Sequence, residues 1–595
     1  MKKILFILPI VSCLFGCNNS HPIADTVVLG TTYTAEKDND GVVEAFAVKN
    51  GKFIYVGNKD GVQKYIKTGK TVVINNENGL TIPGATEGHG HFLGINSVAK
   101  KLPCYGIKTY QEIKDYLSGL SEKPKFHISW GLDYEAYISK TGGWNPNMNY
   151  AQDLDTVAED YPVICIDDSG HQALCNGVAL KKAKLIDDNY KKINDVRGGL
   201  VLYDEGGDQI SGWVCDELVM YVIRENIDFS SYGDEFFMDS TKNAIDELHA
   251  RGFTNYLEAY INVFTEDGFH KAMNLLDKKN ELTCNIASYS TVRSFEDKEY
   301  ETRMEKIKSL ADQYKSKHFD PYNVKLFADG VVEAFTGWMF NEYPINWLIG
   351  KGDHGNIIWS PEELYNLVLK ANELGLNVHT HTFGDAACHY TIDAYIEAEK
   401  QLRKHFNNSL AHVKNIQDSD ISRVAKYNIG VASNMIWHSV PIEDGAGYDD
   451  EFEFMESLYP EGAYANGYPM KSFINKGANI CSSTDAPCGE KVEGNIQNII
   501  EVSTTGIDPE FNGRSFNPSE LLTVREALNC LTINGAKQLG IEKKCGSIKV
   551  GKNADFVILD KNFLNYTELT DLRTIHETKI NNVYFEGKIV FPKNS

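Results

Sequence analysis

Clusters of basic residues are missing from this chain of 595 residues, whose formal net charge is −23 at pH 7. Proteins that bind nucleic acids hold the phosphates with clustered lysine and arginine side chains. The strongly acidic balance therefore excludes a nucleic-acid partner, and the acidic residues are expected to form a solvated surface. Low-complexity tracts and repeats of about 20–50 residues are also missing, which excludes a solenoid.

Cysteine patterns that mark a disulfide scaffold or a Cys-x-x-Cys site are missing as well. Of the 12 cysteines, Cys13 and Cys17 lie near the N-terminus and the others are scattered from Cys104 to Cys545. An exported location permits disulfides, but no pairing follows from this spacing. We expect most of these cysteines to be buried free thiols.

The chain has no apolar run of about 20 residues, the length that a bilayer-spanning helix needs. At the N-terminus, Lys2 and Lys3 precede a short apolar core over residues 4–15, which is typical of a secretion signal. Residues 14–17, Leu-Phe-Gly-Cys, resemble the bacterial lipoprotein signal, in which Cys17 becomes the lipidated first residue. A plain cleaved signal is the alternative. We therefore expect a signal peptide over 1–16, a spacer over 17–24, and an exported protein anchored to a membrane on its periplasmic or cell-surface side.

What the chain does contain is ordinary globular composition, with 42% hydrophobic and 24% charged residues. Its length suits a large barrel with an accessory domain. Residues 25–80 read as strands and turns, including a hairpin around Asn50-Gly51, and residues 541–595 do the same. Because each end is short of core on its own, we expect the two ends to form one small composite β-sandwich.

Between these ends, over 81–540, strand and helix patterns alternate. In residues 361–375, Leu364, Leu367, Val368 and Ala371 follow helical spacing, and a strand pattern comes next at 376–381. Such alternation over several hundred residues predicts an α/β fold, a (β/α)8 TIM-like barrel.

His89-Gly90-His91 comes after an apolar run that ends in Pro83-Gly84. Residues i and i+2 of a strand point to the same face, so both imidazoles can reach one metal ion. Taken alone, the pair is a weak motif, and two structural histidines are the better interpretation. The pair gains weight only from residues much later in the chain.

Four later residues lie at or near the ends of short apolar strands, where barrel enzymes place their chemistry; they are Lys325, His381, His412 and Asp485. One βα unit takes roughly 30–35 residues. By that measure these residues and the histidine pair fit strands 1, 4, 5, 6 and 8. The interval before Lys325 is about twice what three units need, so we expect an insertion of on the order of 100 residues within 96–235.

These segments, in this order, resemble the amidohydrolase superfamily, and within it the family 3 branch of YtcJ-like proteins and N-substituted formamide deformylases. The likeness spans nearly the whole chain after the signal. It rests on Pro83-Gly84 with His89-Gly-His91, Val324-Lys-Leu-Phe-Ala-Asp-Gly330, His381-Thr-Phe-Gly-Asp385, Ala411-His412, Ser483-Thr-Asp-Ala-Pro487 and Gly546-Ser-Ile-Lys-Val-Gly-Lys-Asn-Ala-Asp-Phe-Val-Ile-Leu-Asp560.

The resemblance implies one or two divalent metal ions, expected to be zinc, held by His89, His91, Lys325, His381, His412 and Asp485. Lys325 would be carboxylated and bridge two ions, and Asp485 would carry a proton as general base and then acid. His379 is the rival of His381 on the same strand face. Two departures stand out: Glu87 replaces the usual aspartate, and residues 331–340 lack the usual small polar residues and arginine.

The implied activity is hydrolysis of a non-peptide C–N bond, in an amide, formamide or cyclic amide, of a small-molecule substrate. Alternatives are ester hydrolase, deaminase or isomerase chemistry, or a metal-free or inactive barrel that binds a small ligand. Candidate substrate contacts are His171, Asp329, Trp338 and His438. His171 could instead only pack, and Trp338 and His438 could belong to the core instead of an aromatic wall of the site.

Overall fold

The structure, a computed structural model, describes residues 21–94, 100–101, 109–120, 123–132, 144–145, 148–204, 207–295, 300–344, 354–439, 448–489, 493–509, 514–515 and 517–593. The lipidation site expected at Cys17 lies outside these residues. Within them, no helix combines the length and the apolar character that crossing a membrane requires. The nine cysteines described are all free and buried, as expected.

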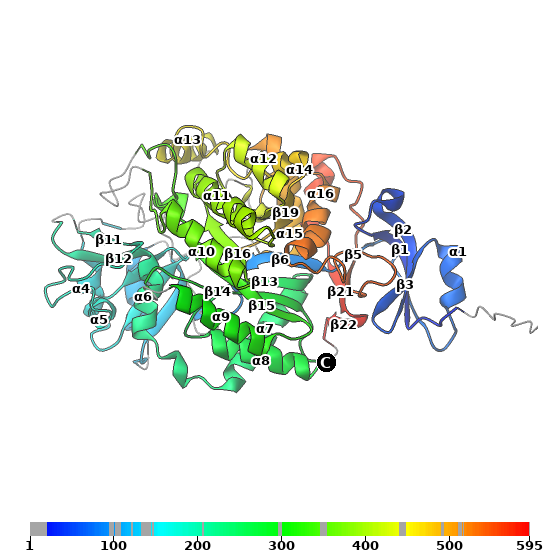
Figure 1. The fold of residues 1–595 in the computed structure, drawn as a ribbon, viewed down its shortest axis with the longest axis horizontal. Coiled ribbons are helices and arrows are strands. Elements are labelled where there is room, and N and C mark those ends of the chain that lie inside the picture. The colour runs from blue at the N-terminus through cyan, green and yellow to red at the C-terminus, as the bar shows by residue number, and fades with distance from the viewer. Residues whose placement is uncertain are drawn as a thin grey trace, which may run out of the picture.

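Eight parallel strands form the central sheet, in the order in which they occur along the chain. They are β6 (Ala85–Gly90), β13 (Phe253–Ile261), β14 (Asn285–Thr291), β15 (Phe319–Phe327), β16 (Asn377–Thr382), β17 (Ser409–His412), β18 (Gly430–Ser433) and β19 (Asn479–Ser482). The sheet is a nearly closed barrel with helices around it (Figure 1). This confirms the predicted α/β barrel.

The helices that come after the strands cover the outside of the barrel. They are α7 (Asp234–Ala250), α8 (Glu266–Lys278), α9 (Tyr300–Tyr314), α10 (Pro361–Glu373), α11 (Asp385–Leu402), α12 (Asp418–Tyr427), α14 (Met470–Lys476) and α15 (Ile496–Thr505). At the start of α10, Ser360 forms a capping box with Glu363, Pro361 takes the first helical position, and the predicted apolar stripe is buried. The sequence pattern thus predicted this helix, which ends two residues early.

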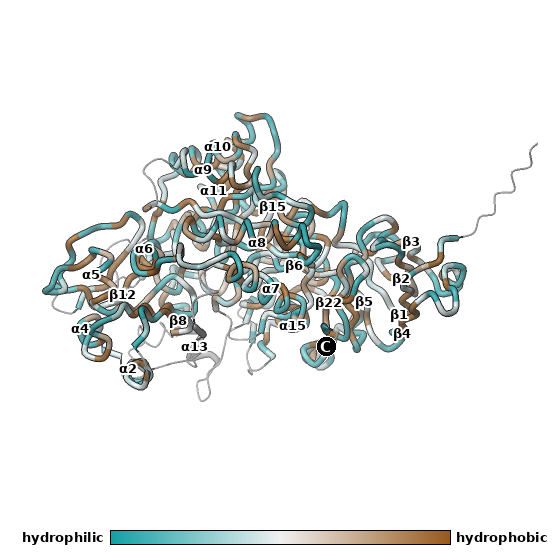
Figure 2. Tube along the Cα trace, turned by 90° about the horizontal axis from the view of Figure 1, so that it is seen from below, coloured by the Kyte–Doolittle hydropathy of each residue, from teal (hydrophilic) through white to brown (hydrophobic). Residues whose placement is uncertain are grey.

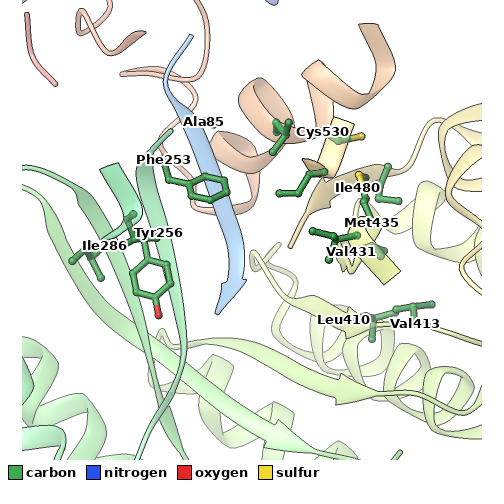
Figure 3. Close-up of a cluster of buried hydrophobic side chains, with 14 of the residues drawn as sticks. Ala85, Phe253, Tyr256, Ile286, Leu410, Val413, Val431, Met435, Ile480 and Cys530 are labelled. Carbon is green, nitrogen blue, oxygen red and sulfur yellow. The ribbon is translucent and has the colours of Figure 1, made fainter. Parts of the chain in front are cut away.

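Apolar side chains fill the space between the strands and their helices. Figure 3 shows part of this core around β6, with Ala85 beside Phe253, and Ile480 near Met435 and Cys530. Figure 2 shows hydrophobic and hydrophilic residues alternating along the chain. Burial of the outward faces of the strands fixes which side chains point into the barrel, because successive strand residues point to opposite sides.

The two ends of the chain join in one eight-stranded sheet. Its strands are β1 (Thr26–Tyr33), β2 (Val42–Lys49), β3 (Lys52–Gly57), β4 (Val72–Asn75), β5 (Leu80–Pro83), β20 (Phe556–Leu559), β21 (Ile580–Phe585) and β22 (Lys588–Phe591). The β2–β3 hairpin turns at Asn50-Gly51, both with positive φ. N- and C-terminal segments meet where β5 pairs with β20.

A third sheet lies between β6 and α7 in the chain and on the opposite side of the barrel from the terminal sheet (Figure 1). We call this layer the insertion. Its strands are β7 (Lys100–Lys101), β8 (His127–Leu132), β9 (Val163–Asp167), β10 (Gln172–Cys175), β11 (Gly199–Tyr203) and β12 (Ile210–Asp216), and its helices include α2 (Tyr110–Ser118), α4 (Tyr150–Asp155), α5 (Gly177–Lys182) and α6 (Glu217–Asn226).

Candidate metal centre

One cavity receives all six residues for which the sequence predicts metal binding. His89 is in β6 and His91 lies directly after it, while Lys325 lies in β15. The others are His381 in β16, His412 at the end of β17 and Asp485 just after β19. All six line the cavity. The barrel therefore brings together side chains from strands 1, 4, 5, 6 and 8, at the end where such enzymes carry their sites.

Asp485 lies beside both histidines of the pair. Its Oδ1 atom is 3.1 Å from His89 Nε2 and 2.9 Å from His91 Nε2. One ligand atom from each of these three residues lies within 4.8 Å of the other two. Two backbone bonds fix the arrangement: Asp485 donates its N–H to the His89 carbonyl, and His91 donates to the Ala486 carbonyl, each at 2.8 Å.

The remaining three residues surround His89. The Lys325 Nζ atom is 3.5 Å from His89 Nε2. The ring centre of His412 is 4.7 Å from that of His89 and 4.6 Å from that of His381. The cavity thus gathers imidazole rings, a carboxylate and an amine from residues that lie as far apart in the chain as His89 and Asp485.

Two of these histidines have one ring nitrogen engaged by a protein oxygen. His381 Nε2 is 2.9 Å from the Gly330 carbonyl oxygen, and His412 Nδ1 is 2.9 Å from Asn434 Oδ1. Metal-binding histidines usually donate one N–H to such an oxygen, which fixes the ring and leaves the other nitrogen as a ligand. Asn434 was not among the residues predicted from the sequence, although a polar residue directly after a barrel strand was a usable signal.

His379 differs from His381 in its surroundings. Its Nδ1 is 2.7 Å from Ser409 Oγ and its Nε2 is 2.6 Å from His89 Nδ1, so both ring nitrogens are engaged. Lys325 pairs in register with His379, and Phe327 with His381. His379 therefore sits one layer below the cavity, where it orients His89 instead of lining the cavity.

Burial sets the charge of these groups. It lowers the pKa of His89 and His381 well below the ordinary value, and that of His412 to about 3, so the rings are neutral. Burial also lowers the pKa of Lys325 to about 7, although Asp485 opposes the shift. For Asp485, burial favours the acid, but His412 and His91 outweigh it and lower its pKa.

The backbone is strained at two of the predicted ligands. His412 and the following Val413 have φ values of 71° and 51°, and Asp485 has 63°. Residues other than glycine rarely adopt this left-handed region, and a β-branched valine there is a clear outlier. Such strain clusters at functional sites, where surrounding contacts hold it in place.

Glu87 lies below the cavity and is completely buried. Its Oε1 accepts the backbone N–H groups of His89 and Thr484, each at 3.0 Å, so the carboxyl group links strand 1 to the segment after strand 8. Burial raises the pKa of Glu87 to about 8. The residue that departs from the family pattern thus supports both the histidine pair and the Asp485 segment.

Of the four candidate substrate contacts, only His171 lines the cavity. It reaches the cavity from the insertion, its ring lies 4.7 Å from that of His381, and its Nδ1 is 2.8 Å from Asp216 Oδ1. The other three, Asp329, Trp338 and His438, are buried and are not among the described residues that line the cavity.

The surroundings of these three explain their positions. Asp329 accepts the backbone N–H groups of Trp338 and Gly384, which ties two strand-end loops together. The Trp338 ring stacks on Tyr390 at 4.8 Å. His438 Nε2 lies 3.0 Å from the Asn517 carbonyl oxygen. Loop side chains follow tertiary packing, which sequence spacing does not specify.

Comparison with known proteins agrees with this architecture. A model of the amidohydrolase family matches residues 72–591. YtcJ of Bacillus subtilis is 24% identical over 95% of this chain and 99% of its own, and an N-substituted formamide deformylase of Arthrobacter pascens is 26% identical over 35% and 36%.

Among solved structures, an uncharacterized metal-dependent hydrolase from Pyrococcus furiosus superposes with a TM-score of 0.64 over 91% of this chain and 100% of its own, at 19% identity. That likeness supports the fold alone. Because the family model spans most of the chain, the predicted resemblance is confirmed: this chain belongs to the amidohydrolase family.

Proposed function

We propose that this chain is a metal-dependent hydrolase that cleaves a non-peptide C–N bond in a small amide, formamide or cyclic amide. The observation that carries the proposal is the cluster of His89, His91 and Asp485, whose ligand atoms lie within 4.8 Å of one another. Family membership supports the general class of hydrolase. The formamide deformylase among the relatives supports the choice of a C–N bond.

The donor set fits divalent metal ions. Neutral imidazoles offer lone pairs, and an ionised carboxylate adds negative charge, a combination that suits zinc. We propose His89, His91, Lys325, His381, His412 and Asp485 as the residues that hold one or two ions. When bound, the ions would polarise the scissile carbonyl and make an attacking water more acidic.

Lys325 has the environment that carboxylation requires. With a pKa of about 7, a large share of its side chain is the free amine near neutral pH. That amine can attack CO2, forming a carbamate and releasing one proton. The carbamate would replace a buried cation with an anion that has two oxygen donors, which removes the repulsion between a protonated lysine and bound cations.

Asp485 would move the proton. Its carboxylate is ionised and lies beside His89 and His91, so an Oδ atom can accept the proton of the attacking water. As the C–O bond forms and the C–N bond breaks, the same carboxyl can give that proton to the departing nitrogen. The hydrogen bond between His91 and Asp485 favours the charged form of the carboxyl group until then.

The test compares Asp485→Asn with Asp393→Asn, a surface control on α11, using zinc-loaded protein and a series of N-formyl and N-acyl amines. We expect Asp485→Asn to lower kcat by about 10²–10⁴-fold, the usual range for a proton-transfer residue. The control should keep the wild-type rate. Hydrolysis by Asp485→Asn at the wild-type rate would overturn the proposed role.

A further inference from the structure

The wall of the cavity that faces the barrel residues comes from the insertion and is apolar. Trp130 of β8, Ile166 of β9, and Val219 and Met220 of α6 all line the cavity. The same four side chains belong to one cluster of buried apolar residues that forms the core of the insertion. The wall is therefore the inner surface of a packed core, which presents a preformed shape.

Glycine packing holds the indole of Trp130 in place. Gly170 has a φ of +79°, and a Cβ atom at this position would lie 2.9 Å from the Trp130 ring and 3.5 Å from Cys488 Sγ. A side chain there would displace the indole. The backbone of Gly170 thus packs directly against the indole of Trp130, which restricts movement of this ring.

Asp216 and Ser169, two polar residues that the insertion brings to the cavity, form hydrogen bonds within the protein. Asp216 accepts from Asn356 Nδ2 at 2.8 Å while it holds His171. The hydroxyl of Ser169 lies 2.7 Å from Asp167 Oδ2. A charged group of a substrate on this side would have to displace buried hydrogen bonds, which costs free energy.

Lys325 and Arg293 carry the cationic groups among the described residues that line the cavity. Lys325 belongs to the metal cluster. Arg293 Nη1 lies 2.5 Å from Glu217 Oε1, both side chains being buried, and the guanidinium lies 3.9 Å from the ring centre of Phe327. The charge of Arg293 is therefore already balanced by Glu217, and a substrate carboxylate would have to share the guanidinium with that buried partner.

We infer that the insertion forms a subsite for an uncharged apolar substituent, aromatic or branched aliphatic, attached close to the C–N bond that is cleaved. The inference rests on the proposed function, since it names the substrate class of the same site. The subsite selects by burying apolar surface of the substituent against Trp130, Ile166, Val219 and Met220. We expect discrimination of at least about tenfold between an apolar group and its carboxylated analogue.

Binding tests the inference without turnover. Zinc-loaded Asp485→Asn protein is titrated by calorimetry with N-benzylacetamide and with N-(4-carboxybenzyl)acetamide. Binding of the benzyl compound that is at least about tenfold tighter supports the subsite. Equal or tighter binding of the carboxylate overturns it. The wild type is assayed on the same compounds: binding preference without hydrolysis of any amide would sink the proposed function and leave the subsite standing.

Two valines on α6 provide a matched pair that locates the subsite. Val219 lines the cavity, whereas Val222 is equally buried in the same cluster and is not among the described lining residues. Val219→Ala should raise the affinity for N-(4-tert-butylbenzyl)acetamide relative to N-benzylacetamide by about tenfold. Val222→Ala should leave that ratio unchanged at a similar loss of thermal stability. The same ratio in both variants would show that the wall does not contact the substituent.

Discussion

His89 Nδ1 and His379 Nε2 are 2.6 Å apart, a hydrogen bond between two buried rings from strands 1 and 5. One ring must donate and the other accept, so His379 fixes which nitrogen of His89 faces the cavity. Ser409 in turn holds His379 from strand 6. The orientation of the first predicted ligand therefore depends on a chain of contacts across the barrel.

Loss of His379 should weaken metal binding without removing a ligand. In His379→Ala the His89 ring loses its hydrogen-bond partner, and we expect metal affinity to fall by about 10–100-fold, the usual effect of an outer partner. Competition with a chelator measures it. His405→Ala, which removes a half-exposed histidine outside the cavity, is the control. Equal affinities in the two variants would show that His379 does not orient His89.

Carboxylation of Lys325 predicts a dependence on CO2. Wild-type protein stripped of metal at mildly acidic pH and freed of CO2 should regain activity only when zinc and bicarbonate are both added. Lys325→Arg keeps a positive charge but forms no comparable carbamate, so its activity should stay at least about 100-fold lower under all conditions. Reactivation of the wild type by zinc alone, in rigorously CO2-free buffer, would refute the carbamate.

Glu87 is predicted to stabilise the site by accepting two buried N–H groups. Glu87→Ala leaves the N–H groups of His89 and Thr484 without this partner, and should lower the free energy of unfolding by about 2–4 kcal/mol. Glu87→Gln keeps an oxygen acceptor and should lose much less. Denaturant unfolding of both variants measures the difference, and equal losses would mean that the two hydrogen bonds contribute little.

A second polar cluster links the barrel to the terminal sheet. His318, just before β15, has Nδ1 2.7 Å from Asp277 Oδ1 of α8 and Nε2 3.3 Å from Glu586 Oε1 between β21 and β22. Although burial opposes the change, the hydrogen bonds to both carboxylates raise the pKa of His318. The bond with His318 lowers the pKa of Glu586 to about 2.

The sign of the pH effect is set by these shifts. Because the pKa of His318 is raised on folding, protonated His318 stabilises the fold. This stabilisation is fully present below the unfolded pKa of 6.5 and is lost as pH rises through the folded pKa. Because the pKa of Glu586 is lowered on folding, its carboxylate also stabilises the fold. This stabilisation is fully present above the unfolded pKa of 4.5 and is lost as pH falls toward 2. The urea concentration at the unfolding midpoint should therefore be highest between pH 4.5 and 6.5 and should decrease at lower and at higher pH. His318→Gln should lack the decrease at higher pH. An unchanged profile in that variant would contradict the link.

How much of the site the sequence could predict depends on what fixes each residue. His89, His91, His381 and His412 belong to barrel strands or their ends, and Asp485 comes just after one. Strand order and unit length made them candidates for one site, and the family resemblance named them as ligands. His379 was recognised only as a rival, because spacing does not distinguish two residues on one strand face that lie at different depths.

Residues outside the strand repeat could not be predicted in this way. Trp338 and His438 lie in loops, and their orientation depends on partners such as Tyr390 and Asn517. The apolar wall with Trp130 and Val219 comes from the insertion, whose own strands have no fixed spacing to the barrel. Its position over the cavity emerges only from how the two layers pack.

Metal content of the purified wild type and of His89→Ala is the sharpest test of the proposed metal site. We expect one or two equivalents of a divalent ion, zinc above all, in the wild type. His89→Ala should lose most of that metal while circular dichroism shows that its fold is retained. A wild type that binds no divalent ion after incubation with zinc, or a variant that binds as much metal as the wild type, would rule out the site.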